Sequence, residues 1–168
     1  MSKRRFMFHT QGYDLPYLQE SILCSKDNAW LGHGFYYWLE EGDAIYWGQT
    51  AKRNYKKFSV YVSDIDCENI LDTVFNEEHY IFWIRSIDKA VKHLYKTTHT
   101  KPTIECVNAY LMEKGGWDKS ITGIMFQDLP VNDKILKVAG FYYRKRIQLA
   151  IFNNKIIINF IHHFDGEC

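Results

Sequence analysis

The stretch on which the fold prediction depends is Trp30-Leu31-Gly32-His33-Gly34-Phe35-Tyr36-Tyr37-Trp38. Two glycines flank His33, and glycine lets a backbone turn sharply and approach its neighbours closely. Four consecutive aromatic residues follow, and we expect them to form a short extended segment over Phe35–Trp38. At least two of these rings belong in the core, and the offset of Tyr36 from Gly34 favours Tyr36 as the ring that faces a ligand. His33 is expected to be a loop residue.

The segments around this stretch have clear periodicities. Before it, alternation predicts a strand over Arg5–Thr10, and Asp14 followed by Pro16 predicts a short helix over Leu15–Leu23. After it, helices are predicted over Asp43–Lys52, Glu78–Tyr95 and Ile104–Lys114, and strands over Phe58–Val62, Ile121–Phe126 and Ile147–Phe152, with a buried strand over Ile156–Ile161.

This order places two helices between an N-terminal and a C-terminal group of strands. It predicts an α+β fold with a mostly antiparallel sheet and helices packed against it. The length of 168 residues suits a single domain over residues 1–168.

Composition narrows the function classes. The net charge of +1 gives no overall attraction to nucleic acid or membrane. No apolar run approaches the roughly 20 residues of a membrane helix, and no secretion signal is visible, so a cytoplasmic protein is expected. The four cysteines form no C-x-x-C pair, and no metal site is expected.

Three pieces of sequence suggest chemistry. The first is His9-Thr10, at the end of the first predicted strand. The second is the Gly32–Tyr37 stretch, followed by a helix that carries Tyr46 and Trp47. The third is Arg146-Ile147-Gln148, on a late strand.

Taken in this order, the three pieces resemble the diphtheria-toxin-like branch of the ADP-ribosyltransferases, which includes the poly(ADP-ribose) polymerases. The same chain is similar to small bacterial members through Trp30–Tyr36 and through Gly140-Phe141 followed by Ile147-Gln148. The resemblance implies a split sheet core, NAD as the cofactor, and His9, Tyr36 and Gln148 as catalytic residues. The NAD-binding residues it implies are His9, Thr10, Gly34, Phe35, Tyr36 and either Tyr46 or Trp47.

Gln148 stands where the polymerases have Glu. Glutamine keeps the hydrogen bond to the ribose but loses the charge, and charge-assisted hydrogen bonds are about twice as strong as neutral ones. In that family, loss of the Glu goes with transfer of a single ADP-ribose unit or with loss of activity, so the resemblance does not imply polymer synthesis.

The chemistry explains these residue types. Cleavage of the nicotinamide–ribose bond leaves an oxocarbenium-like ribose, so the enzyme must hold the nicotinamide and fix the ribose hydroxyls. His9 is expected to donate a hydrogen bond to a ribose hydroxyl, and a Tyr36 ring stacked on nicotinamide contributes roughly 1 kcal/mol beyond burial. Without the family, His9 is a half-buried structural histidine and Gln148 a solvated strand residue.

Four functions remain open at this point. The leading one is a toxin or phage-defence effector that modifies RNA, DNA or protein and has a possible antitoxin partner. Three basic clusters with nearby tyrosines favour a nucleic-acid acceptor: Lys3-Arg4-Arg5, Lys52–Lys57 and Arg144-Lys145-Arg146. The alternatives are a non-catalytic NAD or ADP-ribose binding module, an NAD glycohydrolase, and a partner-binding domain whose aromatic residues are all core. His162-His163-Phe164-Asp165 is expected to be an exposed tail.

Overall fold

A computed structural model describes residues 3–25, 29–128 and 145–168. Its strands are β1 (Arg4–Gly12), β2 (Phe35–Trp38), β3 (Lys57–Asp66), β4 (Ile70–Asp72), β5 (Gly123–Asp128), β6 (Arg146–Ile151) and β7 (Ile157–Glu167). Its helices are α1 (Glu41–Ala51), α2 (Glu77–Thr98) and α3 (Ile104–Glu113). The α+β class is confirmed, and among the described residues no helix has the length and apolar character needed to cross a membrane.

The strands form one mixed sheet in the order β4-β5-β6-β2-β1-β3-β7. β4 and β5 are parallel, and the other neighbouring pairs are antiparallel. Phe35–Trp38 forms β2, as predicted, and lies in the middle of the sheet between β6 and β1. The aromatic stretch therefore supplies the central strand around which the sheet is ordered.

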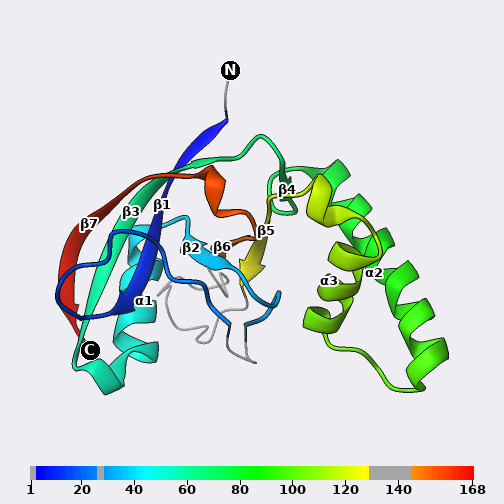
Figure 1. Ribbon diagram of the computed structural model, residues 1–168, viewed down its shortest axis with the longest axis horizontal. Helices are drawn as coiled ribbons and strands as arrows, with labels where there is room; N and C mark the ends of the chain where they lie inside the picture. Colours follow the sequence, from blue (N-terminus) through cyan, green and yellow to red (C-terminus); the bar gives the residue numbers. More distant parts are fainter. Residues whose placement is uncertain (1–2, 26–28, 129–144) are drawn as a thin grey trace, which may run out of the picture.

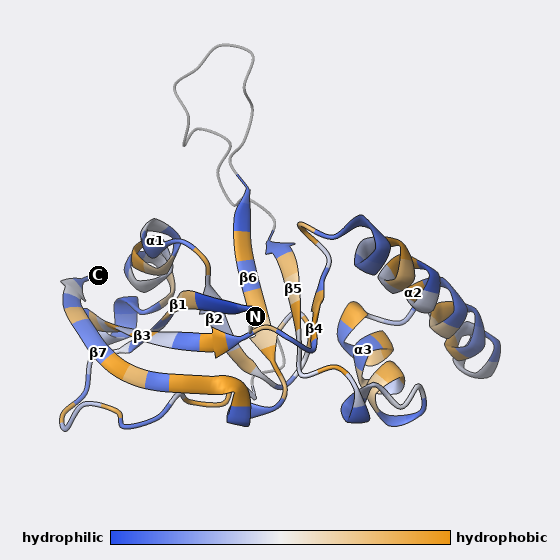
Figure 2. Cartoon of the chain, turned by 90° about the horizontal axis from the view of Figure 1, so that it is seen from above, coloured by the Kyte–Doolittle hydropathy of each residue, from blue (hydrophilic) through white to orange (hydrophobic). Residues whose placement is uncertain are grey.

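The helices divide between the two ends of the sheet. α1 packs on β1 and β3, whereas α2 and α3 lie side by side near β4 and β5 (Figure 1). Figure 2 shows β6 between the two groups of helices. Both groups of helices cover the same face of the sheet. Trp38 packs against α1, and Phe126 packs against α2 and α3. Gln148 is the register partner of both Trp38 and Phe126, so these three side chains share one face.

The predicted helix over Leu15–Leu23 is wrong. Residues 13–23 are irregular and cross the face of the sheet opposite the helices, where they bond to strand side chains. The Leu18 N–H donates to the Tyr61 hydroxyl at 3.2 Å, and the Tyr17 hydroxyl donates to Asp165 at 2.7 Å. These long-range bonds outweigh a weak local helix preference, and Pro16 restricts the residue before it to extended backbone.

The predicted buried strand over Ile156–Ile161 is also wrong in part. β7 starts at Ile157, runs to Glu167 and forms one edge of the sheet, so its residues alternate between half-buried and exposed. His162 and His163 therefore lie in a strand and not in an exposed tail. His162 Nε2 lies 2.9 Å from Asp165 Oδ1, and His163 Nε2 lies 2.7 Å from Glu41 Oε1.

Gly48 is required for the packing of α1 on the sheet. A Cβ atom at Gly48 would overlap the ring of Phe58, which is 1% exposed. We expect Gly48→Ala to lower the free energy of unfolding by about 1–3 kcal/mol, the usual cost of overpacking. Urea titration followed by circular dichroism measures it. Gly42→Ala in the same helix is the control, since a Cβ there meets nothing within 4 Å; equal effects of the two substitutions would contradict the packing argument.

Candidate functional site

His9 lies at the junction between β1 and β2. These strands share one registered pair, Phe8 with Trp38, and the imidazole of the next residue, His9, reaches the backbone of β2. Its Nδ1 lies 2.9 Å from the carbonyl oxygen of Tyr36. Because a carbonyl can only accept, Nδ1 carries the proton. The side chain therefore ties the two central strands together where their backbone pairing stops.

The second ring nitrogen of His9 has no hydrogen-bond partner within the described residues. The side chain is 3% exposed, and Nε2 is buried. Burial lowers the pKa of His9 from 6.5 to about 4, so the imidazole is neutral at physiological pH. Nε2 is then an acceptor and not the donor expected from the sequence.

Thr10 connects β1 to α1. Its hydroxyl donates to the carbonyl oxygen of Ala44 at 2.9 Å, and its side chain is buried. This bond fixes the helix that carries Tyr46 and Trp47 over the sheet. In the structure Thr10 therefore positions α1, and the residue is only 5% exposed.

Tyr36 holds the turn that precedes β2. Its hydroxyl donates to the Gly32 carbonyl at 2.7 Å and accepts from the Leu31 N–H at 3.2 Å. Burial raises the pKa of Tyr36 well above its usual value. Gly32 has φ +85°, a left-handed conformation that favours glycine. The Tyr36 hydroxyl is thus used internally, and only its ring remains for contact with a ligand.

Gly34 and Phe35 have structural surroundings. Gly34 exchanges backbone hydrogen bonds with Cys24 at 2.9 and 3.1 Å, and a Cβ there would lie 3.1 Å from the Ile151 carbonyl oxygen. The Phe35 side chain packs on the sheet face opposite the helices. The Phe35 side chain therefore lies on the face opposite Gln148, and Gly34 contributes only backbone atoms.

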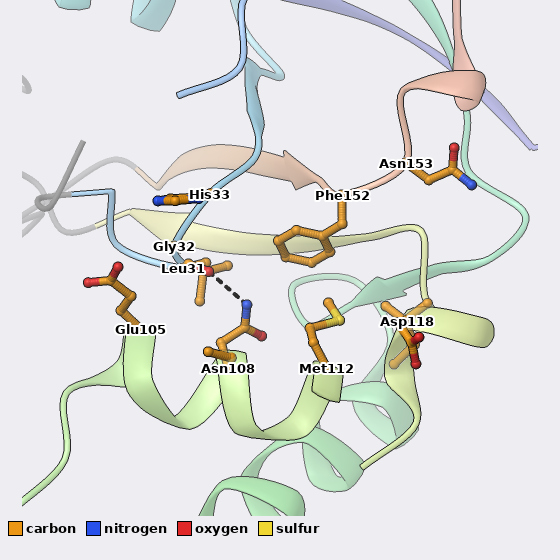
Figure 3. Close-up of a pocket in the computed structure, with 11 residues that line it drawn as sticks. Leu31, Gly32, His33, Glu105, Asn108, Met112, Asp118, Phe152 and Asn153 are labelled. Atoms are coloured by element: carbon orange, nitrogen blue, oxygen red, sulfur yellow. Dashed lines mark hydrogen bonds between the residues drawn. The ribbon is translucent and has the colours of Figure 1, made fainter. Parts of the chain in front are cut away.

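The Gly32–His33 turn faces α3. The turn lines a pocket of about 410 Å³. Figure 3 shows the other walls of this pocket, which come from α3 and from Phe152 and Asn153 just after β6. The Asn108 side-chain N–H donates to the Leu31 carbonyl at 2.7 Å and holds the turn against the helix. The glycine-rich turn therefore lines a pocket with α3, and His33 is exposed at its edge.

Tyr46 and Trp47 both lie near the centre of the sheet but contact different groups. Trp47 is 38% exposed, and its ring lies 5.8 Å from that of Trp38. Tyr46 contacts Arg146, whose guanidinium lies 5.5 Å from the Tyr46 ring and 5.4 Å from the Trp38 ring. Of the two, Trp47 has the more accessible ring.

Arg146 is the site residue that sequence reasoning missed. It was named beside Gln148 and in a basic cluster but given no role of its own, whereas its side chain is 2% exposed and pairs with Asp128. Its spacing of two residues from Gln148 was the available signal, since such residues share one face of a strand.

Gln148 lies in β6, in register with Trp38 on one side and Phe126 on the other. Its side chain is partly buried and shares the helix-covered face with Tyr36, Trp38 and Arg146. His9 follows Phe8, the register partner of Trp38, so its side chain leaves the strand on the opposite face. There it contacts the rings of Tyr37 and Phe160, at 5.2 and 6.1 Å.

The structure therefore brings together Tyr36, Tyr46, Trp47 and Gln148 on one face and leaves His9 at the strand junction behind them. Gly140 and Phe141, which contributed to the resemblance, lie outside the described residues. Among residues 3–25, 29–128 and 145–168, no three His, Cys, Asp or Glu side chains are grouped to hold a metal ion. No family model matches the chain, and no curated protein or solved structure matches it significantly.

Proposed function

We propose that this chain binds NAD at the centre of its sheet and transfers one ADP-ribose unit to a macromolecular acceptor. The observation that carries the proposal is the placement of Gln148 beside aromatic side chains on one face. Tyr36 and Trp38 come from the neighbouring strand, and the exposed Trp47 comes from α1. An amide that fixes hydroxyls next to rings that stack is the combination needed to hold a nicotinamide riboside.

The residues have distinct tasks in this proposal. The indole of Trp47 stacks on nicotinamide and excludes water. The Gln148 carbonyl oxygen accepts a hydrogen bond from a ribose hydroxyl. The bond between the ribose C1′ and the nicotinamide nitrogen breaks, neutral nicotinamide leaves, and C1′ bonds to the acceptor nucleophile, which loses its proton to solvent. The sheet split expected from the resemblance would correspond to the β1–β2 junction that His9 bridges.

A second candidate function, a non-catalytic NAD or ADP-ribose binding module, is favoured by one observation. His9 leaves its strand on the face opposite Gln148, and its Nε2 has almost no accessible surface. If NAD binds only over the Gln148 face, His9 acts by holding β1 to β2 and contributes no contact to the ribose.

Release of nicotinamide from labelled NAD tests the proposed transferase activity, with lysate protein, RNA and DNA each offered as acceptor. Gln148→Glu is expected to raise the rate about fivefold, because a charged acceptor contributes roughly 1 kcal/mol more than a neutral one. Gln148→Ala is expected to lower it to a similar degree. Gln127→Glu is the matched control, since Gln127 is partly buried in β5 but faces the other side of the sheet.

The outcomes separate the candidate functions. Absence of nicotinamide release in the wild type and in Gln148→Glu refutes the proposed enzymatic activity. Calorimetric binding of NAD without release then supports the binding module. Free ADP-ribose that accumulates without any macromolecule identifies a glycohydrolase instead.

A further inference from the structure

A second pocket, of about 370 Å³, lies beside the proposed NAD site. Its size is within the range of small-molecule pockets, about 300–1,000 Å³. The residues that line it include Trp30, Tyr80, Trp83, Phe126, Gln127 and Lys145. The proposed function assigns it no role, although Trp30 begins the stretch on which the fold prediction depends.

The walls of this pocket are aromatic. The Trp30 ring lies 4.9 Å from the Phe126 ring at 32° and 6.4 Å from the Trp83 ring at 66°. Tyr80 lies one turn before Trp83 on α2. Phe126 and Trp83 are buried, whereas Trp30 is 43% and Tyr80 48% exposed. The accessible rings of Trp30 and Tyr80 therefore lie next to the buried rings of Phe126 and Trp83, which form the floor of the pocket.

The charged group of the pocket suits an anion. Lys145 is exposed and supplies a positive charge. Gln127 also lines the pocket, but its side chain points to the other face of the sheet, because its neighbour Phe126 shares the face of Gln148. The Thr73 hydroxyl already donates to the Met125 carbonyl at 2.7 Å. The described residues that line the pocket include no carboxylate. Among these described residues a positively charged ligand has no counter-charge, whereas a phosphate has Lys145.

The pocket is contiguous with the site that holds Gln148. Phe126, on its floor, is the register partner of Gln148 in the next strand and shares its face. Lys145 directly precedes Arg146. Figure 2 shows the end of β5 and the start of β6 at the same end of the sheet as the start of α2. A group held in the pocket is therefore next to the strand position that would hold the ribose.

We infer that this pocket binds an unpaired base of a single-stranded nucleic acid, with the base stacked against Trp30 and Tyr80 and a neighbouring phosphate at Lys145. Stacking on exposed aromatic side chains beside a cation is the general means by which proteins bind single strands. The role of the strand as the ADP-ribose acceptor rests on the proposed function, but the binding of the base does not require NAD.

Fluorescence anisotropy of labelled single-stranded 12-mers tests the inference without NAD, with DNA and RNA of one mixed sequence as separate arms. Trp30→Ala and Tyr80→Ala are each expected to weaken binding about tenfold, while Trp30→Phe retains most of it. Lys145→Ala is expected to weaken binding. It is also expected to reduce the slope of log Kd against log salt concentration by about one, because one phosphate contact is lost. Tyr95→Ala is the control, because Tyr95 lies on the same helix and is 50% exposed outside the pocket.

Three results would overturn the inference: no binding of either strand by the wild type, equal binding by Trp30→Ala, or preference for a duplex or for aromatic peptides. Circular dichroism of each variant verifies that it is folded. Nicotinamide release, measured separately, distinguishes the two proposals. Strand binding without release refutes the proposed function but supports the pocket assignment, whereas release by a protein that ignores single strands refutes the pocket assignment alone.

Discussion

Replacement of Arg146 with alanine is expected to lower the free energy of unfolding by about 3–5 kcal/mol. The guanidinium is 2% exposed, pairs with Asp128, and lies over the rings of Trp38 and Tyr46. Alanine removes the ion pair, both cation–π contacts and the volume that separates β6 from α1. Asp128, whose side chain is 29% exposed, then loses its buried partner.

The measurement is urea denaturation followed by tryptophan fluorescence. Arg146→Met keeps most of the volume without the charge, and we expect it to lose about half as much stability, because an apolar side chain of similar size often replaces a buried ion well. Lys145→Ala is the control for charge alone, since that neighbour is exposed. A loss below about 1 kcal/mol in Arg146→Ala would show that the buried cation does not hold α1 to β6.

Elements with a strong local period were predictable from the sequence. Period-2 alternation predicted β1 and β6, and helical spacing over Glu78–Tyr95 predicted α2, which the structure extends to Glu77–Thr98. The glycine-rich turn before Phe35–Trp38 was also predictable, because few residues other than glycine adopt the positive φ of Gly32.

The elements that the sequence did not predict depend on partners distant in the chain. Residues 13–23 remain irregular because Tyr61 and Asp165, more than 40 residues away, bond to them. Local propensity contains no information about such partners. The edge position of β7 likewise depends on the strand order, and it explains why only one side of that strand is covered.

The candidate site also combines features that local sequence implies with features that depend on distant partners. Arg146 and Gln148 share a face because they are two residues apart on a strand, which the sequence alone implies. The separation of His9 from Gln148 depends on the register of β1 against β2, in which Phe8 and not His9 pairs with Trp38. Register is a property of the assembled sheet, and a shift of one residue would have moved His9 to the other face.

Acidification from pH 6.5 to pH 4 is expected to destabilise the protein by about 3 kcal/mol through His9. The pKa of His9 falls from 6.5 to about 4 on folding, mainly because the imidazole is buried, with the hydrogen bond to Tyr36 opposing the shift and Lys52 adding to it. Above pH 6.5 the imidazole is neutral in both states and contributes nothing. Between the two values the unfolded chain binds a proton that the folded chain does not, so stability falls as the pH falls, at about 1.4 kcal/mol per pH unit.

The comparison that isolates His9 is the difference in unfolding free energy between the wild type and His9→Asn, measured in urea from pH 7.5 to pH 4. Asparagine keeps an N–H near the Tyr36 carbonyl but does not titrate, so the wild type is expected to lose stability relative to the variant as the pH falls. Asp165 does not interfere. Burial opposes ionisation there, but hydrogen bonds from Ser59, His162 and Tyr17 outweigh it and lower the pKa of Asp165 below 3.8. Its contribution is therefore lost only at lower pH. A difference that stays constant across this range would mean that His9 is accessible to protons and that its Nε2 is not a buried acceptor.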